Sequence, residues 1–264
     1  MKEIQIRAIS GILYAGIIVG AIFLSPLAIT IVIGLFSCLA LWEFQRLIRF
    51  TSILPILSFL TLSTYSYLGY NSLYTDGILD HIAMAINLLL IILLFSSKKL
   101  SYSYPLKLIL SVGYLSLSSY FISRSGFSGV EYNPWTLALL YFSIWTNNSF
   151  AYLFGTNFGK HKLLPSISPK KSWEGFFGGM LVTIILNYFI SDYIIVFRAN
   201  WHWILFAFSI PILATLGDFI QSYFKRIAMV KDSGSLIPGH GGFYDRMDSV
   251  IFVAPFYYLL LKFI

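Results

Sequence analysis

Residues 27–43, LAITIVIGLFSCLALWE, run for 17 positions with a single charged side chain, Glu43, at the end. A helix that crosses a bilayer needs about 20 mostly apolar residues, and short polar breaks separate this stretch from others like it. The whole chain is 58% hydrophobic and only 11% charged. These features predict an all-α, polytopic integral membrane protein with about nine transmembrane helices. The apolar stretches lie near residues 8–25, 27–43, 53–70, 78–96, 106–123, 135–153, 174–196, 201–222 and 247–263.

The basic residues predict the orientation of the chain, because short loops that face the cytoplasm carry an excess of Lys and Arg. With nine spans and the N-terminus inside, 15 of the 18 cations fall on the cytoplasmic face, and Arg124, Arg198 and Lys262 fall on the other. We therefore expect a multi-pass protein of the cell inner membrane with a cytoplasmic N-terminus and an outside C-terminus. The 15 are Lys2, Arg7, Arg46, Arg49, Lys98, Lys99, Lys107, Lys160, Lys162, Lys170, Lys171, Lys225, Arg226, Lys231 and Arg246.

The net charge of +7 predicts contact with membrane lipids and no nucleic-acid partner, because inward-facing cations lie well against anionic head groups. The single cysteine, Cys38, excludes an intrachain disulfide and a cysteine-based metal cluster.

Charged residues divide the chain into two parts, a membrane scaffold at 1–134 and a catalytic region at 135–264 that faces the cytoplasm. In the scaffold, Glu43 lies three residues before Arg46, a spacing typical of an ion pair on a helix surface. We expect an interfacial pair there, with a catalytic acid as the alternative. A solvated turn on the outward face is expected for Asp76, Asp80 and His81.

The stretch from Asp218 to Asp248, DFIQSYFKRIAMVKDSGSLIPGHGGFYDRMD, holds eight of the chain's 29 Asp, Glu, Lys and Arg residues. A carboxylate such as Asp218 inside a membrane helix is costly and is a functional candidate by default. Positions 218, 222 and 225 share one helix face, and Asp245 and Asp248 can face one point. Carboxylates together with phosphate oxygens suit Mg²⁺, so this stretch predicts a site for a metal ion and phosphates. A solvated loop between two helices is the alternative.

A second polar loop, FGTNFGKHKLLPSISPKKSWEGFFGG, precedes a helix expected to begin near Ser172. Ser172 can cap the free amides of that helix, and Glu174 suits the positive end of the helix dipole. Lys170 and Lys171 beside this end predict an anion site. The alternative is that the lysines only enforce topology.

The stretch from Ser222 to Asp248 resembles the signature of the phosphatidate cytidylyltransferases, also called CDP-diacylglycerol synthases. The GKHKL and SPKKSWEG segments also resemble this family, and the resemblance covers the chain from about residue 141 onward. The matching positions in the signature are Ser222, Lys225, Arg226, Lys231, Asp232, Ser233, Pro238, His240, Gly241, Gly242, Asp245, Arg246 and Asp248.

The resemblance implies transfer of a cytidylyl group from CTP to phosphatidic acid, which yields CDP-diacylglycerol and pyrophosphate. It implies Mg²⁺, with a second, monovalent cation such as K⁺, and a homodimer is a further expectation. Metal would be held by Asp218, Asp245 and Asp248. The phosphates would meet Lys225, Arg226 and Lys231, and Lys170 and Lys171 would close over them. Asp232, His240 and Arg246 are expected to act in catalysis, and Ser222, Gly241 and Gly242 in nucleotide binding.

Three positions depart from the family pattern. Asn148 stands where an aspartate is usual, Thr156 where a basic residue is common, and Gln221 where glutamate is frequent. Replacing a carboxylate by an amide keeps hydrogen bonding but removes negative charge. These departures favour, as a second reading, a weakened relative that acts as a lipid-binding or assembly subunit. An ion-coupled transporter is the third, although it would place ionisable residues on several spans near the midplane.

Overall fold

Short polar signals begin several of the helices, and they separate apolar stretches that almost touch in the sequence. The Ser25 hydroxyl accepts a hydrogen bond from the Ala28 N–H at 3.0 Å, and Pro26 follows as the first helical residue. Asn133 caps the helix that starts at Pro134 in the same way, through the Trp135 N–H at 3.0 Å. A capping side chain followed by proline is a favoured helix start.

The computed structural model is almost entirely helical. It describes residues 2–68, 73–96, 103–128, 131–191, 200–239 and 241–262. The helices are α1 (Lys2–Leu24), α2 (Pro26–Leu47), α3 (Leu54–Tyr67), α4 (Leu73–Phe95), α5 (Tyr104–Ile109), the π-helical η1 (Leu110–Ser116), α6 (Leu117–Arg124), α7 (Pro134–Phe158), α8 (Trp173–Ser191), α9 (Asn200–Ile227) and α10 (Phe243–Lys262). Two antiparallel hairpins connect them, β1 (Phe127–Ser128) with β2 (Glu131–Tyr132), and β3 (Lys162–Leu164) with β4 (Ser168–Ser172).

Each apolar stretch of the sequence lies mainly on a helix, with α5, η1 and α6 together covering the fifth. The all-α prediction is therefore confirmed. Among the described residues, five helices are long and apolar enough to cross a membrane, so the protein is a multi-pass membrane protein, and the count of nine stays a prediction. The five are Pro26–Leu47, Asp76–Phe95, Tyr104–Arg124, Trp173–Ile190 and Trp201–Ile227.

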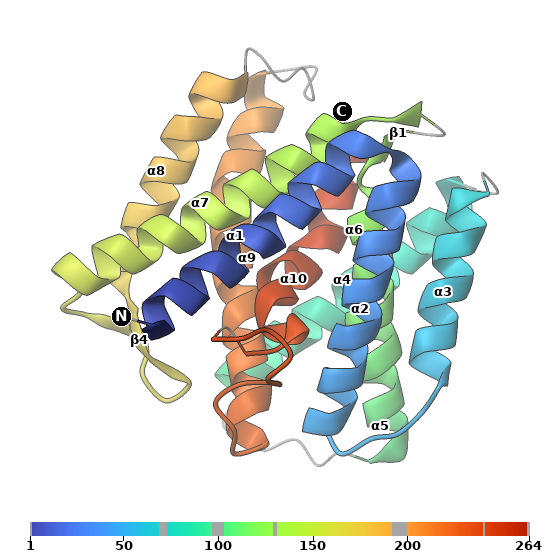
Figure 1. The fold of residues 1–264 in the computed structure, drawn as a ribbon, viewed down its shortest axis with the longest axis horizontal. Coiled ribbons are helices and arrows are strands. Elements are labelled where there is room, and N and C mark those ends of the chain that lie inside the picture. Colours follow the sequence, from blue (N-terminus) through green and yellow to red (C-terminus); the bar gives the residue numbers. More distant parts are fainter. Residues whose placement is uncertain are drawn as a thin grey trace.

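Helix α10 lies at the centre of the bundle and packs against α2, α4, α6, α7 and α9 (Figure 1). Most of its length is buried. The β3–β4 hairpin, the C-terminal ends of α2 and α9, and the segment that joins α9 to α10 lie at one end of the molecule, whereas α10 finishes at the other (Figure 1). The β3–β4 hairpin and the described residues of the segment after α9 are thus gathered at one end.

Small residues let α7 and α8 approach closely. A Cβ atom added at Gly175 would lie 2.6 Å from the Ala151 carbonyl oxygen, and one at Gly179 would lie 2.7 Å from that of Asn147. Such contacts are typical of packed membrane helices. The crossing fixes the point at which the β3–β4 hairpin leaves α7 and enters α8.

The end of the molecule opposite the hairpin contains a buried polar network. Asp76 is 2% exposed and accepts hydrogen bonds from Tyr120 at 2.7 Å, Arg124 at 3.0 Å and Tyr258 at 3.1 Å. Asp80 is fully buried, with Lys262 at 3.6 Å. The prediction of a solvated turn is wrong for both aspartates, because cations and hydroxyls on α6 and α10 cover them; only His81 is exposed.

Candidate active site

The β3–β4 hairpin brings Lys171 to the carboxylate of Asp218 on α9. Lys171 Nζ lies 2.6 Å from Asp218 Oδ2 and 4.5 Å from the centre of the Phe219 ring. The Ser222 hydroxyl donates to Asp218 Oδ1 at 3.3 Å, which confirms that these α9 residues share a face. Arg226 Nε donates to the Ile167 carbonyl at 3.1 Å and ties the hairpin to α9.

The first turn of α8 holds the base of this hairpin. The Ser172 hydroxyl accepts a hydrogen bond from the Gly175 N–H at 3.2 Å, which confirms the predicted cap. Glu174 accepts from the backbone N–H groups of Lys160 and His161, and lies 2.6 Å from His161 Nδ1. Glu174 therefore binds the preceding loop, while Lys170 remains exposed on β4.

Asp245, in the first turn of α10 and ahead of its apolar stretch, is surrounded by donors. Its Oδ1 accepts from Lys225 Nζ at 2.8 Å and from Gln221 Nε2 at 2.9 Å. Its Oδ2 lies 2.8 Å from the Ser233 N–H, 2.9 Å from the Ser233 hydroxyl and 3.0 Å from the Gly242 N–H. Burial alone would raise the pKa of the Asp245 carboxyl. The Lys225 charge and the backbone donors have a larger, opposite effect, so the pKa lies below its ordinary value.

Asp218 and Asp248 are brought near each other where α9 and α10 cross at Gly217. A Cβ atom at Gly217 would lie 2.7 Å from Phe252 Cβ and 3.1 Å from the Asp248 carbonyl. The negative charge of Asp218 repels that of Asp248, and the positive charges of Lys225 and Lys171 offset part of this repulsion. Two carboxylates fit Mg²⁺, which binds one or two of them and completes its shell with substrate phosphates and water. The described residues include no group of three or more metal-ligating side chains.

The segment before α10 uses glycine where a side chain has no room. Gly241 has a φ of +81°, and a Cβ atom there would lie 2.5 Å from Asp245 Oδ2. A Cβ atom on Gly242 would collide with the Glu43 carboxylate. These glycines let the backbone close around two carboxylates. His240 lies outside the described residues.

Glu43, on α2, reaches this segment from the scaffold part of the chain. Its side chain is 1% exposed, and its Oε2 accepts hydrogen bonds from the Ser233 hydroxyl and the Tyr244 N–H, both at 2.9 Å. The predicted interfacial ion pair with Arg46 is wrong, because Glu43 points into the protein and the Arg46 guanidinium lies 4.7 Å from the centre of the Trp42 ring. No motif in the sequence signals this contact.

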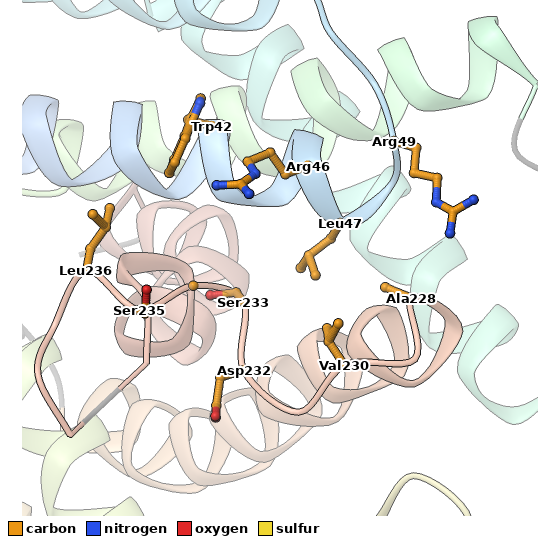
Figure 2. A pocket seen from close by; sticks show the side chains of 11 residues that line it. Trp42, Arg46, Leu47, Arg49, Ala228, Val230, Asp232, Ser233, Ser235 and Leu236 are labelled. Carbon is orange, nitrogen blue, oxygen red and sulfur yellow. The ribbon is translucent and has the colours of Figure 1, made fainter.

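A pocket of about 340 Å³ lies between the C-terminal part of α2 and the residues that follow α9, which include Ser233. Figure 2 shows Trp42 and Arg46 of α2 along one wall and the residues that follow α9 along the other, with the Asp232 side chain pointing away from Arg46. Asp232 and Lys231 are exposed. The Arg246 carbonyl accepts a hydrogen bond from the Tyr14 hydroxyl at 3.2 Å, so α1 also contacts the start of α10.

The three departures from the family pattern have different surroundings. Gln221 is buried and donates to both Asp245 and the Tyr244 carbonyl. Asn148 Nδ2 donates to the Ser249 hydroxyl at 3.3 Å, next to Asp248. The Thr156 hydroxyl bonds carbonyls of its own helix and is exposed. Gln221 and Asn148 therefore lie at the site. The described hydrogen bonds of the Thr156 side chain join it only to its own helix.

Apolar helices that carry paired carboxylates and lysines at one end define a membrane protein whose site suits polyanionic, phosphate-bearing ligands. The chain belongs to the cytidylyltransferase family, whose model matches residues 5–264. It is 30% identical over 270 residues to the phosphatidate cytidylyltransferase of Bacillus subtilis strain 168, an alignment that covers 99% of this chain and 98% of that protein.

Staphylococcal relatives match a shorter part of the chain at higher identity. The phosphatidate cytidylyltransferase of Staphylococcus aureus strain COL is 39% identical over 155 residues, and that of Staphylococcus epidermidis strain ATCC 12228 is 37% identical over 153. These alignments cover 58% of this chain and 57% of each relative. The chain thus matches little more than half the length of these relatives.

Proposed function

We propose that the protein is a phosphatidate cytidylyltransferase, which transfers a cytidylyl group from CTP to phosphatidic acid. Membership of the cytidylyltransferase family and the relatives named above support this reaction. The observation that carries the proposal is the pairing of Lys171 with Asp218 and of Lys225 with Asp245 at one end of the bundle. A soluble nucleotide and a membrane lipid can meet at such a place.

In the proposed reaction, a phosphate oxygen of phosphatidic acid attacks the α-phosphorus of CTP. The bond from this phosphorus to the bridging oxygen breaks, and pyrophosphate leaves with that electron pair. Two polyanions have to approach each other, and fixed cations reduce the repulsion between them. Asp218 fixes the Lys171 ammonium and Asp245 fixes the Lys225 ammonium. We assign these two lysines to the phosphates of CTP.

We assign Asp218 and Asp248 to a bound Mg²⁺, since both come from the α9–α10 crossing and provide oxygen ligands. When bound, the ion would neutralise charge on the phosphates. Asp245 already accepts hydrogen bonds from Lys225, Gln221, Ser233 and Gly242. In this arrangement Asp245 positions Lys225.

The monovalent cation and the homodimer remain predictions.

For the membrane, we propose nine spans, a cytoplasmic N-terminus and a location in the inner membrane. In Figure 1 the chain starts near the end where the hairpin lies and finishes at the other, as an odd number of crossings requires. At the end where the site lies, α2 ends with Arg46 in its last turn, α5 carries Lys107, and the β3–β4 hairpin carries Lys171 (Figure 1). Because short cytoplasmic loops are rich in Lys and Arg, this end is the one that we propose faces the cytoplasm.

The reaction is tested by incubating purified protein with labelled CTP and phosphatidic acid, with and without Mg²⁺. We expect Mg²⁺-dependent labelled CDP-diacylglycerol and an equal amount of pyrophosphate. Folded protein that releases pyrophosphate without lipid product, or forms neither, would contradict the proposal.

Asp248→Ala tests the site within that assay. We expect turnover to fall by at least about 100-fold, because a ligand of the ion that offsets phosphate charge is lost. Glu131→Gln, which neutralises an exposed carboxylate on β2 at the far end of the molecule, is the matched control and should retain activity. Near-normal turnover in Asp248→Ala would remove this residue from the site.

A further inference from the structure

Glu43 bonds two separate parts of the site segment. Its Oε2 accepts from the Ser233 hydroxyl, 190 residues away in the sequence, and from the Tyr244 N–H, 201 residues away. Ser233 belongs to the segment that follows α9, and Tyr244 to the first turn of α10. One carboxylate from α2 therefore bonds both the interior of the connection between α9 and α10 and the first turn of α10.

Ser233 links Glu43 to Asp245, which in turn bonds Lys225. Its hydroxyl oxygen lies 2.9 Å from Glu43 Oε2 and 2.9 Å from Asp245 Oδ2, and its N–H donates to the same Asp245 oxygen at 2.8 Å. Asp245 in turn bonds Lys225 at 2.8 Å. A shift of the Glu43 carboxylate would therefore move Ser233, then Asp245, and then the Lys225 ammonium.

The backbone around Glu43 is shaped to admit its carboxylate. Cβ atoms at Gly234 and at Gly242 would both collide with carboxylate atoms of Glu43. Gly234 lies inside the segment between α9 and α10, and Gly242 is its last residue. The segment thus closes directly on Glu43, with no side chain between.

The energetics favour a positional role over a contribution to stability. Glu43 is 1% exposed, and among the described residues no Lys or Arg pairs with it and its Oε1 has no hydrogen-bond partner. Burying a carboxylate in this way destabilises the fold, and an apolar side chain of similar size would avoid that penalty. What the carboxylate supplies is a fixed acceptor for Ser233 and Tyr244.

We propose that Glu43 is a positioning residue of the cytidylyl-transfer site, which fixes Lys225 through Ser233 and Asp245. The role of Lys225 in the reaction rests on the function proposed above. The proposal extends the site into the part of the chain before residue 134.

The test compares Glu43→Ala and Glu43→Gln with Gln45→Ala. Gln45 is a buried polar residue of the same helix whose Oε1 accepts from the Ser52 N–H at 3.0 Å, away from the site. We expect Glu43→Ala to lower kcat by about 100-fold with little change in KM for CTP, because a small displacement of a catalytic group has an effect of this size. Glu43→Gln keeps an oxygen acceptor and should recover most of the lost kcat, and Gln45→Ala should leave kcat unchanged.

Hydrogen exchange of the backbone amides gives a readout that needs no turnover. The Tyr244 and Ser233 amides should exchange faster in Glu43→Ala than in the unaltered protein, while Glu43→Gln and Gln45→Ala should leave them protected. This pattern would support the positional role even if the unaltered protein made no CDP-diacylglycerol, in which case only the proposed reaction would fail. Unchanged exchange in Glu43→Ala, or equal losses of kcat in Glu43→Ala and Glu43→Gln, would overturn the inference.

Discussion

Gln221 places an amide where a glutamate would face Asp245. Its Nε2 donates to Asp245 Oδ1 at 2.9 Å and to the Tyr244 carbonyl at 3.1 Å. A carboxylate has no hydrogen to donate to either acceptor. The amide therefore satisfies two buried acceptors that a glutamate at this position could not.

Gln221→Glu should destabilise the protein, since it buries a second negative charge beside Asp245. We expect the free energy of unfolding to fall by about 3 kcal/mol, a loss typical of a buried charge that is left without its partner. Gln221→Met, which only removes the donors, should cost about 1 kcal/mol. Thermal unfolding in detergent measures both, and equal stability of the two variants would contradict the argument.

Asn148 is the departure that bears on activity. It donates to Ser249, the neighbour of Asp248. Asn148→Asp would add negative charge near the Asp218–Asp248 pair and should lower the Mg²⁺ concentration needed for half-maximal turnover by about 10-fold, equivalent to about 1.4 kcal/mol. A Mg²⁺ titration of both proteins measures this, with Thr156→Lys, on the exposed face of α7, as the comparison. A large rise in turnover at saturating Mg²⁺ would instead favour the weakened-relative reading.

At the scale of the elements, the α7–α8 crossing decides where the hairpin and Lys171 lie. Gly175→Leu should force the two helices apart, with a loss of stability of about 2 kcal/mol and a larger loss of turnover. Gly16→Leu is the control, because a Cβ atom at Gly16 meets nothing within 4 Å. Turnover and thermal unfolding of the two variants check this, and equal behaviour would show that the crossing is not tightly constrained.

Local signals in the sequence predicted the elements well. Apolar stretches became helices, and Ser172 caps α8 because a cap needs only its own three following residues. The closeness of Lys225 and Asp245 agrees with the motif that contains both. The position of Glu43 and the pairing of Asp76 with Arg124 depend on helices that are distant in the sequence. Each looks in isolation like an ordinary surface charge, so sequence spacing could not predict them.

At the scale of the whole molecule, the proposed orientation can be measured with cysteines. The chain has one cysteine, Cys38, partly buried in α2, so Cys38→Ala provides a background for Ser235→Cys near the site and Glu131→Cys at the far end. Both replaced residues are exposed. An impermeant thiol reagent should label Ser235→Cys only from the cytoplasmic side and Glu131→Cys only from the outside. Labelling from the reverse sides would overturn the proposed topology.

The buried network around Asp76 and Asp80 has a consequence for how the protein is made. Tyr258, which donates to Asp76, follows it by 182 residues, and Lys262 approaches Asp80 from the same helix. During synthesis, α6 provides Tyr120 and Arg124 for Asp76 before α10 exists, whereas the Lys262 ammonium that approaches Asp80 arrives only with α10. Carboxylates without partners are costly in a bilayer, so we expect this end of α4 to be fully stabilised only after α10 has been inserted.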